Sequence, residues 1–143
     1  MAGFNVLRDI GDKGLRVLPV SSLTASVGDL LDLAVGSATW AKVTSSSVHF
    51  TRKAIVMQAI TSASTVLAYE LDGSEDVEVQ SANTANTAHN GDRMLATDEN
   101  TINNTGTDNT SKEAIFLQIG AGRNTTTIIG RVMVGSGVNP AAA

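Results

Sequence analysis

The segment from residue 54 to residue 80 reads AIVMQAITSASTVLAYELDGSEDVEVQ, and its pattern indicates the fold class of the chain. Residues 54–60 are nearly all apolar, as in a buried strand, and residues 65–71 form a second apolar run after a break of small polar residues. After the turn signal Asp-Gly-Ser, apolar and polar side chains alternate, with Val77 and Val79 on one face and the charged side chains on the other. Alternation with a period of two predicts a half-buried strand rather than a helix.

Short segments with strand character recur along the rest of the chain. Within residues 27–35, the pattern places Leu31, Leu33 and Val35 on one face and Asp32 on the other. The last two of these segments, residues 114–119 and 125–134, are separated by a glycine-rich turn and predict a C-terminal hairpin. We therefore predict an all-β fold, a small β-barrel or sandwich with long polar loops and an extended N-terminal arm. The further strand candidates are residues 39–43, 93–97, 114–119 and 125–134.

The length of 143 residues is that of a single domain. Residues 1–26 mix charged, glycine-containing and extended sequence, which fits either an arm that becomes ordered on a partner or a first strand. Residues 27–135 form the predicted β-rich domain, and residues 136–143 a flexible tail. Two stretches of small polar residues, 81–90 and 98–112, predict long loops, which are often functional or ordered by a neighbour.

Composition excludes several classes of function. The net charge of −4 argues against a general nucleic-acid binder, which needs cations to displace phosphate counterions. The absence of cysteine excludes disulfides, thiolate metal sites and a cysteine nucleophile. The N-terminus lacks the basic and apolar regions of a secretory signal, and no apolar run approaches the roughly 20 residues of a membrane span.

The sequence contains no pattern typical of a catalytic or metal centre. His49 has no second ligand at metal-binding spacing, so a solvated or hydrogen-bonded histidine is expected. Asp98, Glu99 and Asp108 do not have the spacing of an EF-hand loop. Trp40 is expected to pack in or beside the core. We therefore expect neither an enzyme nor a bound cofactor or metal.

A family resemblance points to a structural role. Residues 90–107, NGDRMLATDENTINNTGT, resemble the small capsid decoration (cement) proteins of tailed bacteriophages, and VGDL at 27–30, WAKV at 40–43 and IIGRV at 128–132 fit the same family. The resemblance implies a β-rich module on the outer surface of an icosahedral shell, often a homotrimer, that binds neighbouring major capsid subunits. It implies a location on the virion exterior, after synthesis in the host cytoplasm, and no catalytic residues.

The expected function is therefore a capsid decoration protein that binds the major capsid protein and stabilises the shell, without binding nucleic acid or membrane. One alternative is a head-fibre base or a tail structural component. Another is a carbohydrate-binding module that uses Trp40 and Tyr69 for stacking. A trimer is favoured as the oligomeric state. The residues predicted to contact the capsid or another subunit are Phe4, Asn5, Val6, Leu7, Asn100, Ile102, Asn103, Asn104 and Thr105.

Overall fold

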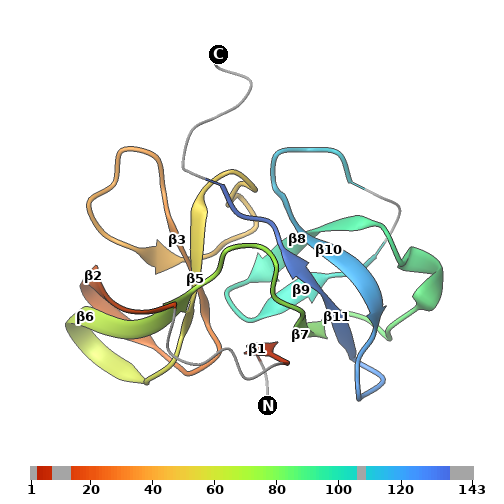
Figure 1. The fold of residues 1–143 in the computed structure, drawn as a ribbon, viewed down its shortest axis with the longest axis horizontal. Coiled ribbons are helices and arrows are strands. Elements are labelled where there is room, and N and C mark those ends of the chain that lie inside the picture. Colours follow the sequence, from red (N-terminus) through yellow and green to blue (C-terminus); the bar gives the residue numbers. More distant parts are fainter. Residues whose placement is uncertain (1–2, 8–13, 106–108, 136–143) are drawn as a thin grey trace.

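The computed structural model of the protein describes residues 3–7, 14–105 and 109–135, and it confirms the predicted all-β fold (Figure 1). Apart from one 3₁₀ turn, η1 (Thr87–His89), the regular elements of these residues are strands. The strands are β1 (Phe4–Val6), β2 (Leu15–Ala25), β3 (Leu30–Leu33), β4 (Ala41–Lys42), β5 (Arg52–Val56), β6 (Ile60–Glu70), β7 (Val77–Ser81), β8 (Arg93–Asp98), β9 (Thr101–Asn103), β10 (Ala114–Ala121) and β11 (Thr127–Val132).

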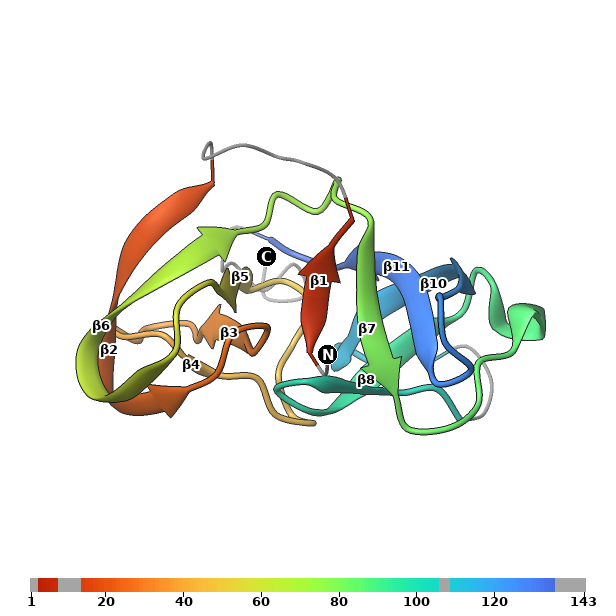
Figure 2. The ribbon, with the colours of Figure 1, turned by 90° about the horizontal axis from the view of Figure 1, so that it is seen from below.

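The strands form two curled sheets that lie side by side (Figures 1 and 2). Sheet A has the order β1-β7-β11-β10-β8-β9, and β9 returns to pair in parallel with β7. Strands β7, β11, β10, β8 and β9 therefore close into a small barrel. Sheet B has the order β2-β6-β5-β3-β4, and a parallel bridge between Val20 and Trp40 brings its two ends together.

Two clusters of buried side chains hold these sheets. One cluster fills the barrel and the space between the sheets, and it includes Phe4, Ile55 and Phe116. The other lies within the curl of sheet B and includes Ala54 and Val56. Successive side chains of β5 thus enter different clusters, so this strand is buried on both faces and reads as a continuous apolar run.

The first strand of the opening segment ends earlier than predicted. Residues 57–59 are exposed and belong to the connection between β5 and β6, where the Met57 N–H donates to the carbonyl of Leu67 at 2.9 Å. The predicted polar break before residue 65 is instead part of β6, which pairs along its length with β2. Ser22 and Ser62, each with φ of 45°, lie where the register of this pair shifts. Such bulges bend the β2–β6 strand pair and increase its twist.

The prediction for residues 27–35 needs a similar correction. β3 spans only residues 30–33, and Leu30 and Leu31 are both buried because one faces sheet A and the other faces the interior of sheet B. Val35 is 65% exposed, and Asp32 is buried rather than solvated. Asp32 pairs in register with Lys53 of β5, a partner that lies too far along the chain for its role to be read from the local pattern.

Of residues 1–26, the described ones, 3–7 and 14–26, contain two paired strands. β1 pairs with β7, and β2 pairs with β6 and contributes Leu18 and Val20 to the core of sheet B. The predicted loop 98–112 contains strand β9, which completes the barrel. The predicted tail, residues 136–143, lies outside the described residues.

Candidate interaction surfaces

The two segments predicted to make contacts meet along one edge of β7. β1 pairs with residues 77–79 of β7, and β9 pairs with the next two residues on the same strand. Both segments are also hydrogen-bonded to the start of β3 in sheet B. The Phe4 N–H donates to Gly28 O at 2.8 Å, and the Leu30 N–H donates to Glu99 O at 2.7 Å. The structure therefore brings together candidates that are far apart in sequence.

Burial removes several of these candidates from a docking role in this conformation. Phe4 is 1% exposed and makes an edge-to-face contact with Phe116, with the ring centroids 6.4 Å apart. Ile102 is fully buried, and Val6 packs against the same cluster. Phe4 and Val6 occupy alternate positions of β1 and Ile102 lies on β9, and all three pack in or against the same cluster. The candidates left at the surface are Leu7, Asn103 and Thr105, with Asn5 and Asn100 half-buried.

Asn104 is also buried, and its hydrogen bonds give it a structural role. Its Oδ1 accepts from Asn83 N–H at 2.8 Å, and its Nδ2 donates to Asn83 O at 3.0 Å and to Thr84 O at 3.3 Å. The side chain thus acts as a backbone-like bridge between two polar loops. Through these bonds the buried carboxamide holds the exposed residues 83–84 against the end of β9.

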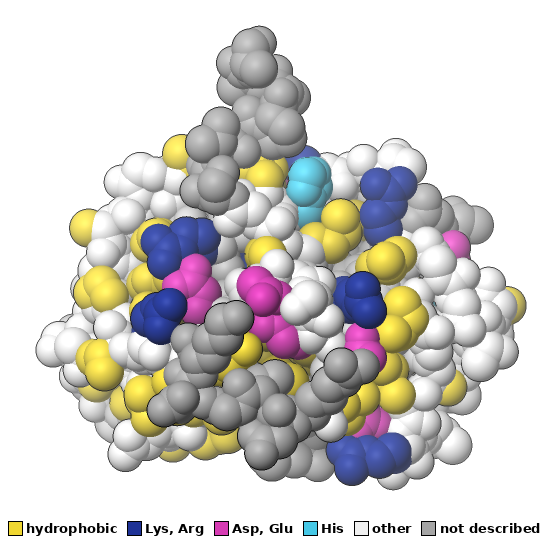
Figure 3. Space-filling view, in the orientation of Figure 1, with side chains coloured by type: hydrophobic (Ala, Val, Ile, Leu, Met, Phe, Trp, Pro, Cys, Tyr) yellow, Lys and Arg dark blue, Asp and Glu magenta, His cyan; other side chains and the backbone are white. Residues whose placement is uncertain are grey.

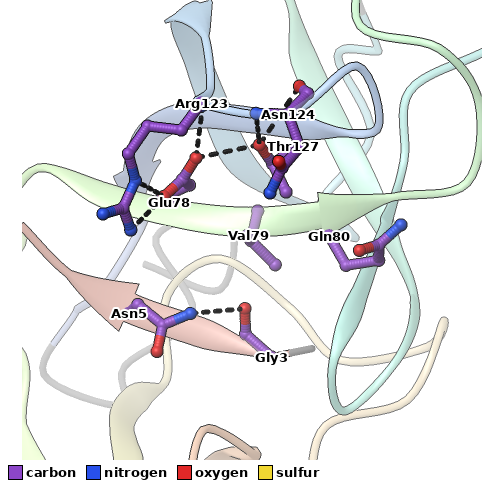
Figure 4. A pocket seen from close by; sticks show the side chains of 8 residues that line it. All are labelled: Gly3, Asn5, Glu78, Val79, Gln80, Arg123, Asn124 and Thr127. Atoms are coloured by element: carbon purple, nitrogen blue, oxygen red, sulfur yellow. Dashed lines mark hydrogen bonds and ion pairs between the residues drawn. The ribbon is translucent and has the colours of Figure 1, made fainter. Parts of the chain in front are cut away.

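A small polar pocket lies between β1, β7 and the turn that joins β10 to β11 (Figure 4). Its volume is about 170 Å³, and Asn5, Gln80 and Asn124 line it together with Glu78 and Arg123. Figure 4 shows that Glu78 points toward Arg123 and Thr127, whereas Asn5 and Gln80 stand apart from that cluster. The pocket is therefore walled on one side by an internal ion pair.

Glu78 fixes the β10–β11 turn. Its carboxylate accepts from the Arg123 backbone N–H at 2.6 Å, from Arg123 Nε at 2.7 Å and from Thr127 Oγ1 at 2.8 Å. Burial alone would raise the pKa of Glu78, but the hydrogen bonds from Arg123 and Thr127 outweigh burial and lower the pKa below its ordinary value. The alternating pattern correctly predicted Glu78 on the polar face of its strand. The neighbouring residues gave no indication that the β10–β11 turn would cover this side chain.

A row of apolar side chains is exposed on the outer face of sheet B. Val17 is opposite Leu67 in the β2–β6 pair, and the backbone of Met57, in the connection after β5, bonds to Leu67, so the three residues are neighbours. Val17 is 69% exposed and Met57 is 45% exposed, and Leu67 is half-buried. None of the three belongs to either buried cluster. We refer to Val17, Leu67 and Met57 as the sheet B row.

A second row lies on the outside of the barrel, formed by Leu117 and Ile119 of β10 and Ile129 of β11. Ile119 is 43% exposed, and the other two are half-buried. We refer to these three as the barrel row. Ion pairs between Arg131 and Asp76, at 3.2 Å, and between Arg123 and Glu78, at 2.6 Å, join strands or turns of the same sheet.

Figure 3 shows apolar side chains on both halves of the face it presents, interspersed with basic and acidic side chains. A mixture of exposed apolar and charged groups is typical of surfaces that bind other proteins. Because five of the six row residues stand on paired strands, they are presented without the ordering cost that a flexible loop would carry.

The aromatic residues considered for carbohydrate stacking are not exposed. Trp40 is 4% exposed, with the guanidinium of Arg52 lying 5.4 Å from the centre of its ring, and Tyr69 is 6% exposed. Trp40 is therefore a core residue, as the sequence indicated. Among the described residues, no group of three or more His, Cys, Asp or Glu side chains is arranged to hold a metal ion, and Asp108 lies outside these residues.

Comparison with known proteins gives no relative of this chain: no family model, no curated protein and no solved structure matches it. The described residues contain no helix long and apolar enough to cross a membrane.

Proposed function

We propose that the protein is a capsid decoration protein of a tailed bacteriophage, which binds the outer surface of the major capsid protein shell and stabilises it. The observation that best supports this proposal is the pair of exposed apolar rows, one on each sheet, held by paired strands and, for Met57, by the connection that bonds to β6. The partner is assigned from the sequence resemblance of residues 90–107 to decoration proteins.

The size of the rows suggests why such a protein would act as an oligomer. Complete burial of one Val, Leu or Met side chain contributes about 1.5–3 kcal/mol, and the sheet B row starts partly buried, so its contact contributes roughly 3 kcal/mol. Taken alone, this is less than the about 4 kcal/mol that corresponds to a millimolar dissociation constant. A homotrimer that places three rows on the shell would bind far more tightly, because the second and third contacts become intramolecular.

Charge on the same surface would set the orientation of docking rather than supply most of the affinity. The Arg123 side chain is 74% exposed although its guanidinium pairs with Glu78. Exposed ion pairs contribute about 0–1 kcal/mol each and are screened by salt. Binding to the shell should therefore depend more on the apolar rows than on ionic strength.

The test is binding of the purified protein to shells assembled from the major capsid protein of the same genome. The variant Val17→Asp/Met57→Asp introduces two charges into the sheet B row, and the matched control Ser21→Asp/Ser64→Asp adds the same charge at exposed positions of β2 and β6. With all proteins shown to be folded by thermal melts, the row variant should bind at least about tenfold more weakly, a loss of about 1.4 kcal/mol, and the control should bind like the unaltered protein.

The heat tolerance of the shells provides a second readout. Shells carrying the unaltered protein should resist heating better than bare shells, and shells mixed with the row variant should behave like bare shells. Absence of binding by the unaltered protein would refute the proposal. A copy number of only a few molecules per particle would favour the head-fibre or tail alternative instead.

A further inference from the structure

A pocket that shares no lining residue with either row lies beside the end of β3. Its volume is about 400 Å³, within the range of about 300–1,000 Å³ typical of small-molecule sites. The pocket is lined on one side by Asp32 and Val35 and on the other by the loop that leads to β5, through Thr44, Ser46, Ser47 and Phe50. We call it the Asp32 pocket.

Two buried groups of opposite charge lie at or behind the wall of this pocket. Asp32, which lines it, is 8% exposed, and its register partner Lys53, which interacts with it electrostatically, is fully buried. The Lys53 ammonium donates to Val48 O at 2.7 Å, to Thr51 O at 3.1 Å and to Thr51 Oγ1 at 2.6 Å. All three of its donor positions are therefore used inside the protein. Lys53 balances the charge of Asp32 without being available to a ligand.

The carboxylate of Asp32 keeps unused acceptor capacity. It accepts hydrogen bonds from the Ser47 hydroxyl and from its own backbone N–H, and the Thr51 hydroxyl, which is 3.1 Å from Val48 O, lies 3.4 Å from it. A carboxylate has about four acceptor positions, so about one remains free of these contacts, and Asp32 lines the pocket. Burial raises the pKa of Asp32, although Lys53 and the two hydroxyls act in the opposite direction.

The charge balance of the pocket selects against ionic ligands. A cation would approach the buried ammonium of Lys53, and an anion would meet the carboxylate of Asp32. Lys42, which also lines the pocket, lies 3.8 Å from Asp29 and 3.6 Å from Glu99, so its charge is already opposed by two carboxylates. A neutral ligand that donates hydrogen bonds fits this arrangement better than either ion.

The rest of the lining indicates the class of that ligand. Ser46 and Thr44 supply hydroxyls, and Val35, Val48 and Phe50 supply apolar surface, with Val35 65% exposed. Alternating hydroxyl groups and C–H faces are the chemistry of a sugar ring. We propose that the Asp32 pocket binds a neutral monosaccharide unit, with a sugar hydroxyl donating to Asp32 and the ring lying against the Phe50 side. The site is distinct from Trp40 and Tyr69, and the proposal does not depend on attachment to a capsid.

Two adjacent serines offer a matched test. Ser45 and Ser46 are both exposed and occupy the same turn, but only Ser46 lines the pocket. The probes are the methyl glycosides of glucose, galactose, mannose and N-acetylglucosamine at millimolar concentration, with binding followed by saturation-transfer NMR and by the ring resonances of Phe50. At least one glycoside should bind, Ser46→Tyr should weaken its binding at least tenfold, and Ser45→Tyr should leave the binding unchanged.

Two further measurements complete the test. Ammonium and inorganic phosphate, used as ionic probes, should not compete with the bound glycoside. Asp32→Asn should weaken sugar binding if this variant folds. If Asp32→Asn does not fold, the comparison of Ser46→Tyr with Ser45→Tyr tests whether the sugar binds in the pocket. The proposal fails if none of the four glycosides binds, if both tyrosine variants reduce binding equally, or if phosphate or ammonium displaces the sugar.

Discussion

Replacement of Glu78 by glutamine tests whether a buried carboxylate holds the β10–β11 turn. Glutamine keeps the size of the side chain but removes the charge that receives hydrogen bonds from the Arg123 backbone, the Arg123 guanidinium and the Thr127 hydroxyl. Hydrogen bonds to charged groups contribute about 1.5–3 kcal/mol each, against about 0.5–1.5 kcal/mol for neutral ones. Weakening three hydrogen bonds in this way would lower the free energy of unfolding by about 3 kcal/mol.

Solvent reduces this figure, because the Arg123 side chain is 74% exposed and its guanidinium can be rehydrated in the variant. We therefore expect Glu78→Gln to lower the free energy of unfolding by about 2–3 kcal/mol near neutral pH, measured by urea denaturation. The control Glu99→Gln removes a half-exposed partner that lies 3.6 Å from Lys42, and it should cost less than about 1 kcal/mol.

The pH dependence gives the reasoning its sharpest check. The folded pKa of Glu78 lies below its unfolded value, so its stabilisation is complete above the unfolded pKa of about 4.3 and disappears as the pH falls through the folded pKa. The difference in stability between the unaltered protein and Glu78→Gln should shrink across that acidic range. A difference that stays constant as the pH falls, or a loss no larger than that of the control, would refute the reasoning.

Three further predictions concern packing, hydrogen bonding and protonation. Gly130→Ala should destabilise the protein by roughly 2 kcal/mol or more, because its methyl group would meet a carbonyl of β10, whereas Gly120→Ala, which meets nothing within 4 Å, should change the stability much less. Asn104→Ala should cost about 2–3 kcal/mol in urea denaturation by removing the three hydrogen bonds of a buried carboxamide, and Asn103→Ala under about 0.5 kcal/mol. Burial lowers the pKa of Lys53 to about 8 against the opposing attraction of Asp32, so its side-chain NMR signal should titrate near that pH. Because its unfolded pKa is about 10.4, Lys53 should make the free energy of unfolding rise with pH between these values, by on the order of 3 kcal/mol.

Local patterns predicted the parts of the fold that depend on neighbouring residues. The alternation around Val77 and Val79 placed both valines in the core, and the glycine-rich turn after β10 joins it to β11 as a hairpin. The apolar run beginning at Ala54 identified a buried strand, because both faces of β5 meet apolar clusters. In these places the chemistry of a few successive residues decides the structure.

The remaining features depend on partners far along the chain. Met57 is apolar yet lies in an exposed connection, and only the pairing of β5 with β6 determines this. β9 is a short polar strand that is identified by its parallel pairing with β7. Asp32 and Glu78 each read as solvent-facing carboxylates, and each is buried by a partner, Lys53 or the β10–β11 turn, that the local pattern does not specify.

The same limit applied to the candidate contacts. Phe4 and Ile102 were predicted as contacts because they lie in the N-terminal segment and in a polar loop, yet both belong to the larger buried cluster. The exposed rows were missed because Val17, Leu67 and Met57 resemble core residues in sequence. Apolar character alone does not distinguish a buried side chain from one that is available to a partner.

Cryo-electron microscopy of shells incubated with the protein tests most directly whether it works by attachment through its strand faces. The account predicts regularly placed density on the shell exterior, in many copies, with Val17 and Met57 of the sheet B row turned toward a capsid subunit or a neighbouring copy. Bare shells, or bound protein whose rows both face solvent, would contradict it.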